Sequence, residues 1–97
     1  MGLHWGTMTG HVSCSGSQAF AEALRSAGVG DSVTVERFLT ALGSDWKGDH
    51  FFFSAGEAGE IRDVVREVRL GTEWSGLLES LAMDAQQAVD SGGWRIE

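Results

Sequence analysis

The chain has 97 residues, of which 42% are hydrophobic and 22% are charged, as is typical of one soluble globular domain over residues 1–97. Fourteen acidic residues against seven basic ones give a formal net charge of −7, and such a surface repels the phosphate backbone of nucleic acids. No stretch approaches the roughly 20 apolar residues of a membrane span, and the first residues lack the basic and apolar regions of a signal peptide. We therefore expect a cytoplasmic protein that binds neither nucleic acid nor membrane.

Residues 2–15 predict one or two short strands joined by loops, because apolar and strand-tolerant residues mix there with glycine. A first helix should follow. Ser15 and Gln18 have the spacing of a capping box, and Ser17 is the alternative N-cap. Apolar residues then recur at helical spacing up to Ala27, and Gly28 is a natural stop.

A second, short helix is predicted from Thr34 as its N-cap to Leu42, and Gly43 ends it. Residues 49–53 come next, with the run Phe51-Phe52-Phe53 bounded by turn residues. A short aromatic run of this kind predicts a strand that is buried on both faces.

The second half of the chain predicts two longer helices and a final strand. Ser54 and Glu57 form a capping box, so a third helix should begin near residue 55 and end at Gly71. Its apolar stripe consists of Ile61, Val64, Val65 and Val68. A fourth helix should run from Thr72 to about Asp90, and residues 94–97 alternate apolar and polar like an edge strand.

The predicted fold is therefore α+β, with about four helices packed on a small two- or three-stranded sheet. The N-terminal strand, the Phe51–Phe53 strand and the C-terminal strand would form that sheet. If the core is assigned correctly, Ile61, Val65 and Leu81 should be buried in it.

The triplet Trp46-Lys47-Gly48 lies near the centre of the chain and resembles the Trp-X-Gly motif of the WXG100 family of secreted helical hairpins. That family needs two long, uninterrupted helices, whereas Gly28 and Gly43 interrupt the first half here. The chain also has no tyrosine, on which the family's C-terminal signal depends. We therefore disfavour this family and expect Trp46 to anchor a loop on the core or, if it is exposed, to contact a partner.

A second resemblance rests on the segments MGLHWG, FFFSAGEAGEIRDVV, EWSGLL and GGWRIE. Together they look like a group of small uncharacterised bacterial proteins of a single domain. The resemblance implies an aromatic strand leading through a Ser-X-X-Glu cap into a helix, then a helix that begins at a tryptophan and a terminal strand. No activity is associated with that group, so it implies no site residues.

The sharpest candidate for chemistry is a metal site built from His4, His11, Cys14 and His50. All four side chains are good ligands for zinc, and His11-X-X-Cys14 is a plausible ligand pair for zinc or nickel. In the alternative interpretation the histidines lie at strand edges and Cys14 is a small buried hydrophobe. Structural zinc sites usually show two tight ligand pairs, and this chain has one at most, which favours a protein without a cofactor.

Two further possibilities involve the same region. Cys14 precedes the first helix and would be a nucleophile with His11 or His50 as base and Asp49 as orienting residue. No other catalytic signature accompanies it, which favours a protein that is not an enzyme. Residues 13–18 would also present backbone N–H groups to an anion, although an ordinary capped helix start explains them equally well.

These observations favour a small acidic protein-interaction module of the inhibitor, immunity or adaptor type, and its partner would be another protein or a second copy of the chain. The alternative is a metal- or small-ligand-binding domain that uses the four residues above. A mixed-charge face on the third helix is the predicted contact surface, in addition to Trp46. It consists of Arg62, Asp63, Arg66, Glu67 and Arg69.

Overall fold

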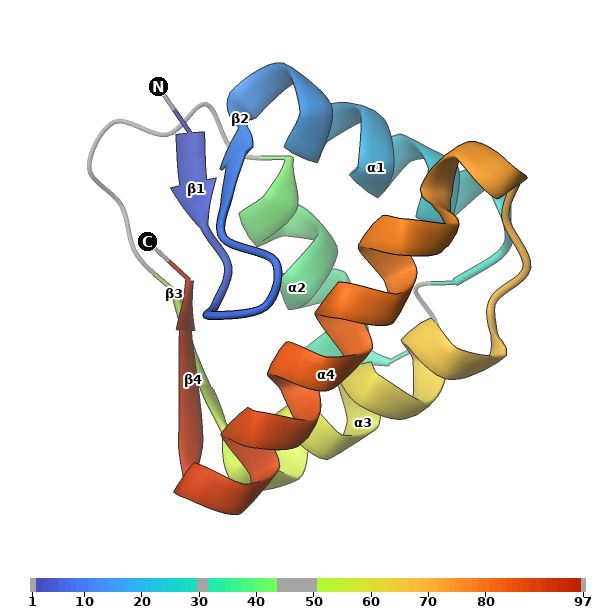
Figure 1. The fold of residues 1–97 in the computed structure, drawn as a ribbon. Helices are drawn as coiled ribbons and strands as arrows, with labels where there is room; N and C mark the ends of the chain where they lie inside the picture. The colour runs from blue at the N-terminus through green and yellow to red at the C-terminus, as the bar shows by residue number, and fades with distance from the viewer. Residues whose placement is uncertain (1, 30–31, 44–50, 97) are drawn as a thin grey trace.

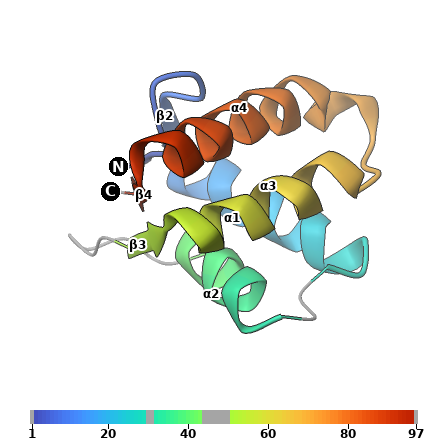
Figure 2. The same ribbon diagram turned by 90° about the horizontal axis from the view of Figure 1, so that it is seen from below.

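The computed structural model describes residues 2–29, 32–43 and 51–96. In chain order the elements are β1 (Gly2–His4), β2 (His11–Ser13), α1 (Cys14–Ser26), α2 (Val33–Leu42), β3 (Phe51–Ser54), α3 (Ala55–Glu67), a 3-10 turn η1 (Thr72–Trp74), α4 (Ser75–Ser91) and β4 (Gly93–Ile96). Helices α3 and α4 lie side by side and run antiparallel, while the strands lie at one end of the helices (Figure 1, Figure 2). The predicted α+β class with four helices is confirmed. Among the described residues, two long helices of a hairpin are not found.

The predicted start of the first helix is wrong by two residues. Ser13, rather than Ser15 or Ser17, is the N-cap of α1, and its hydroxyl accepts a hydrogen bond from the backbone N–H of Gly16 at 3.1 Å. Ser17 is fully buried, and its hydroxyl donates to the carbonyl oxygen of Leu42 at 2.5 Å. That bond joins α1 to α2, so a tertiary contact has taken the side chain that local spacing would assign to capping.

Of the next two predicted helix starts, that of α2 is wrong and that of α3 is confirmed. Helix α2 begins two residues earlier than predicted, because Ser32 rather than Thr34 is its N-cap and accepts the backbone N–H of Val35 at 3.1 Å. The capping box of α3 is confirmed in both directions. Ser54 accepts the N–H of Glu57 at 3.2 Å, and the Glu57 carboxyl accepts the N–H of Ser54 at 2.9 Å.

Helix α3 ends at Glu67, four residues before the predicted stop at Gly71. Val68 leaves the helix with an extended backbone, at φ −67° and ψ 143°. Its side chain and that of Leu70 pack against the core beyond the end of the helix. The end of α4 follows the prediction, since Gly92 adopts the left-handed conformation at φ 94° that favours glycine.

The strands form two separate antiparallel pairs, β1–β2 and β3–β4, and not the single sheet predicted. In the second pair Phe53 lies opposite Trp94, and both rings face the core. Phe52 points to the other face and is 57% exposed, so the prediction of a strand buried on both faces is wrong. A two-stranded ribbon has only one face on the core, and Phe52 instead lies over Gly93, where an added Cβ would fall 2.6 Å from its ring.

The core lies between the four helices and is rich in aromatic side chains. Ile61, Val65 and Leu81 are buried in it, as predicted. Rings pack within two groups, which are Trp5 with Phe20 and Trp74, and Phe38 with Phe53 and Trp94. The indole N–H of Trp94 donates to the carbonyl oxygen of Trp5 at 2.6 Å. This bond ties the two strand pairs together through side chain and backbone rather than through a shared sheet.

Candidate interaction surface

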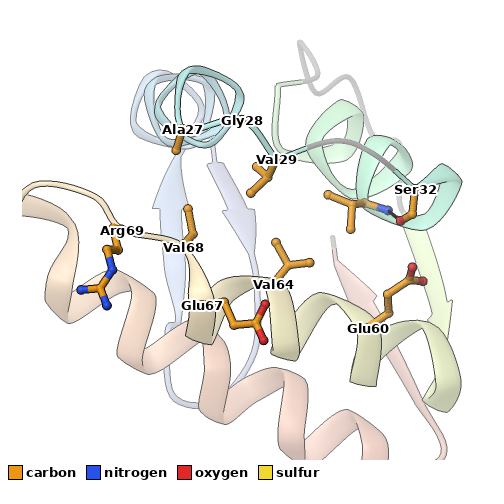
Figure 3. A pocket seen from close by; sticks show the side chains of 10 residues that line it. Ala27, Gly28, Val29, Ser32, Glu60, Val64, Glu67, Val68 and Arg69 are labelled. Atoms are coloured by element: carbon orange, nitrogen blue, oxygen red, sulfur yellow. Dashed lines mark hydrogen bonds between the residues drawn. The ribbon is translucent and has the colours of Figure 1, made fainter.

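A pocket with a volume of about 530 Å³ lies between α3 and residues 27–29, 32 and 35. We call it the α3 pocket (Figure 3). Its lining residues are Ala27, Gly28, Val29, Ser32, Val35, Glu60, Val64, Glu67, Val68 and Arg69. The pocket therefore takes in two of the five charged residues predicted to contact a partner, Glu67 and Arg69.

The floor of the α3 pocket is apolar and its rim is charged. Val29, Val64 and Val68 point into the space (Figure 3) and are only half-buried, although they pack against the core. Glu60 and Ser32 lie at one end of the pocket and Arg69 at the other. The valines and glutamates of α3 share this side because spacings of three, four and seven residues repeat on one helical face.

Charged groups on the rim have no partner within the part of the chain that the structure describes. Neither Glu60 nor Glu67 nor Arg69 takes part in a hydrogen bond or ion pair there, and all three are exposed. Their charges are thus available to a ligand.

The remaining residues of the predicted contact face are divided between other surroundings. Arg62 donates to the side-chain oxygen of Gln86 at 2.8 Å and pairs with Asp63 at 3.0 Å, so it joins α3 to α4. Arg66 lines a second hollow, of about 440 Å³, on the α4 side of α3. Val68 lines both hollows. The mixed-charge face is therefore not one continuous surface but a ridge with a pocket on each side.

The N-terminal half of α3 is tied into the fold by a clamp that the sequence did not reveal. Arg37 of α2 donates to the Glu57 carboxyl at 2.6 Å and to the carbonyl oxygen of Phe52 at 2.6 Å. Its guanidinium also lies 4.5 Å from the centroid of the Phe53 ring. The hydrogen bond from Arg37, with a second from the backbone of Ser54, lowers the pKa of the Glu57 carboxyl.

Asp84 is a second polar residue that sequence reasoning missed. It lies on α4 and is 3% exposed. Its two carboxyl oxygens accept the backbone N–H groups of Met8 at 2.9 Å and Thr9 at 2.7 Å. An acidic residue three positions after Leu81, on the core side of the helix, was the available signal. Because both oxygens are engaged in holding the β1–β2 turn, we interpret Asp84 as structural.

The structure describes the side chain of only one of the four predicted metal ligands, His4. His4 lies opposite His11 in the β1–β2 pair, and the His4 side chain is exposed. The side chains of His11 and Cys14, and all of Trp46, Asp49 and His50, lie outside the described residues. Among the side chains that are described, no three of His, Cys, Asp or Glu gather closely enough to hold a metal ion.

Comparison with known proteins places the chain in a family. Residues 6–97 match the family described as Domain of unknown function (DUF7739), and the chain belongs to it. The predicted resemblance to small proteins of unknown function is thereby confirmed. None of the curated proteins and none of the solved structures matches the chain. In the described part of the chain, no helix has the length and apolar character needed to cross a membrane.

Proposed function

We propose that this domain is a small, non-enzymatic protein-interaction module of the inhibitor, immunity or adaptor type. Its contact surface would be the α3 pocket and the ridge formed by the C-terminal end of α3. The supporting observation is the pocket itself, in which an apolar floor is bordered by charged side chains that have no partner among the described residues. Protein interfaces commonly combine an apolar centre with a polar rim in this way.

The charge of the chain supports the same proposal. A net charge of −7 disfavours binding to nucleic acid and speeds association with a basic protein surface. We place this interaction in the cytoplasm.

Site-specific photo-crosslinking in cells of the source species tests the proposal. A photoreactive amino acid replaces Glu67 on the pocket rim, and a matched control carries it at Asp90, an exposed position near the end of α4. We expect one protein to crosslink at position 67 and not at position 90, and that protein, once purified, to bind the unmodified domain with defined stoichiometry. Equal labelling at both positions, or none at either, would contradict the proposal.

The second candidate function is metal binding, and it rests on the direct opposition of His4 and His11 across β1 and β2. Titration of the apo-protein with zinc in competition with a chromophoric chelator tests it. Zinc affinity lost in both His4→Ala and Cys14→Ala would favour this candidate. Affinity unchanged in both variants would dismiss it.

A further inference from the structure

We infer that the α3 pocket receives a basic, extended peptide segment of a protein partner, in which an apolar side chain lies between two cationic residues three positions apart. This inference rests on the proposed interaction function and specifies the chemistry of the partner. It follows from the shape, the floor and the rim charges of the pocket.

The apolar floor sets the first requirement. Val29, Val64 and Val68 offer only methyl groups to the space between them, and Val35 is buried behind them. The volume of about 530 Å³ falls within the range of roughly 300–1,000 Å³ typical of ligand pockets. A space of this size takes side chains of a peptide rather than a single ion. Burial of an aliphatic side chain against three valines is favourable because it removes apolar surface from water.

The rim charges set the second requirement. Glu60 and Glu67 are two helical turns apart, which corresponds to about 10 Å along the axis of α3. A peptide in the extended polyproline II conformation covers nearly the same distance in three residues, at about 3.1 Å per residue, and brings side chains three positions apart to the same side. Arginine or lysine at positions i and i+3 would therefore reach both carboxylates, with the apolar residue between them over Val64.

The net charge of this rim is negative. Two carboxylates and one guanidinium border the pocket, and the chain as a whole is strongly acidic. Arg69 lies at the far end from Glu60, where it is placed to pair with an acidic group that follows the second cationic residue. A neutral or acidic segment would leave both carboxylates without compensation on desolvation.

Titration of ¹⁵N-labelled protein with the capped peptide Gly-Ser-Arg-Ala-Leu-Arg-Ser-Gly, followed by NMR, tests the inference. Two control peptides replace both arginines by glutamate or the leucine by serine. Among the described residues we expect amide shifts confined to 27–29, 32–35 and 60–69 for the first peptide, and none for the glutamate peptide. The serine peptide should bind more weakly because it cannot fill the apolar floor.

Matched protein variants separate the α3 pocket from the acidic surface in general. The double variant E60Q/E67Q should bind the arginine peptide roughly tenfold more weakly, since two favourable charge pairs are lost. Glu79→Gln removes one negative charge, half the change of the double variant, at the second hollow and should have no effect. Val64→Thr keeps the shape of the floor but adds a hydroxyl, and it should also weaken binding.

Several results would overturn the inference. These are absence of binding, equal binding of the glutamate peptide, equal loss in Glu79→Gln, or shifts spread over the whole surface. Concentration-dependent shifts at the pocket without any peptide would show that a second copy of the chain occupies it. If a partner crosslinks at Glu67 in cells but the arginine peptide does not bind, the interaction function stands and only the partner chemistry is wrong.

Discussion

The clamp formed by Arg37 should stabilise the fold far more than the exposed ion pair between Arg25 of α1 and Glu36, the residue before Arg37 on α2. Arg37 binds the carbonyl oxygen of Phe52, and its partner Glu57 binds the N–H of Ser54. Residues 52 and 54 present their backbone groups to the same edge of β3 because strand geometry repeats every two residues. That edge faces away from β4. Arg37 and Glu57 therefore supply hydrogen-bond partners to the edge of β3 that would otherwise be open to another strand.

Replacement of Arg37 by methionine removes the charge and keeps both an unbranched side chain and the helix propensity. Hydrogen bonds to charged groups contribute about 1.5–3 kcal/mol when they are well protected from water. Here the side chains of Arg37 and Glu57 are 41% and 28% exposed. Water will therefore replace part of the hydrogen bonding that the substitution removes. The cation–π contact with Phe53 adds roughly 0.5–1 kcal/mol. Together we expect Arg37→Met to lower the free energy of unfolding by about 1–2 kcal/mol.

The matched control is Arg25→Met. Arg25 makes a single bond of 3.0 Å to Glu36 of α2, and both side chains are nearly half exposed. We expect this change to leave the free energy of unfolding unchanged within error.

Urea unfolding followed by circular dichroism provides the measurement. A double-mutant cycle of Arg37→Met with Glu57→Gln should show a coupling between the two residues that the cycle of Arg25→Met with Glu36→Gln does not show. If both arginine variants were destabilised to the same extent, the hydrogen bonds to the β3 backbone would contribute nothing measurable, and the reasoning would be refuted.

The coupling between Arg37 and Glu57 should also depend on pH with a definite sign. The pKa of Glu57 is lower in the folded protein than in the unfolded chain, so the carboxyl favours folding only when it is ionised. Its contribution is therefore complete above the unfolded pKa of about 4.3 and is lost as the pH falls through the lowered value. Below that range the difference in stability between the wild type and Arg37→Met should shrink to the part that the contacts of Arg37 with the Phe52 carbonyl and the Phe53 ring supply. A constant difference between pH 7 and pH 2 would contradict this linkage.

Three further predictions use the same urea experiment. Asp84→Ala should lower the free energy of unfolding by about 2–3 kcal/mol because two backbone N–H groups lose their acceptors, whereas Asp90→Asn, exposed on the same helix, should change nothing; equal stability of the two variants would show that water substitutes for the buried carboxyl. Gly6→Ala should cost roughly 1–3 kcal/mol, since the added Cβ would lie 2.5 Å from the Asp84 carboxyl group, and an unchanged free energy of unfolding would mean that the β1–β2 turn moves away freely. Leu81→Ala in the core should cost about 2–4 kcal/mol while the exposed Met83→Ala has little effect, and a reversed order would contradict the orientation of α4.

Features that depend on neighbouring residues could be predicted from the sequence. The Ser54–Glu57 capping box needs only residues three apart, and the left-handed stop at Gly92 needs only a glycine after a helical pattern. The apolar stripe of α3 likewise identified Ile61 and Val65 as core residues. In each case the physical cause acts within one or two turns of the chain.

Features that depend on distant residues could not be predicted from the sequence. Ser17 was considered as an alternative N-cap, because local spacing does not reveal its bond to Leu42, 25 positions away. The bonds of Asp84 join residues more than 70 positions apart. The two separate strand pairs escaped prediction for a related reason. Nothing in the sequence of a short strand states which strand will lie beside it.

The α3 pocket depends on both neighbouring and distant residues. Glu67 and Arg69 were predicted as contact residues from the charge pattern of one helix, and both line the α3 pocket; their contact with a partner stays a prediction. Val29 and Ser32, on the opposite wall, come from a segment about 30 positions earlier, so the pocket exists only after α1 and α2 have packed on α3. Arg62 has the same charge as Arg69 but is committed to Gln86 and Asp63, and this difference is also invisible in the sequence.

The two ends of α3 differ in a way that bears on function. At its N-terminal end Ser54, Glu57 and Arg37 are joined by hydrogen bonds, so substitutions there should lower stability first. At its C-terminal end and just beyond it, Glu67 and Arg69 contribute no such bonds among the described residues, so their replacement should leave the fold intact. Charged side chains with no internal role, placed around an apolar pocket, are available for recognition without a cost in stability. Loss of partner binding with unchanged unfolding is therefore the expected behaviour of variants at the C-terminal end, and the opposite is expected at the N-terminal end.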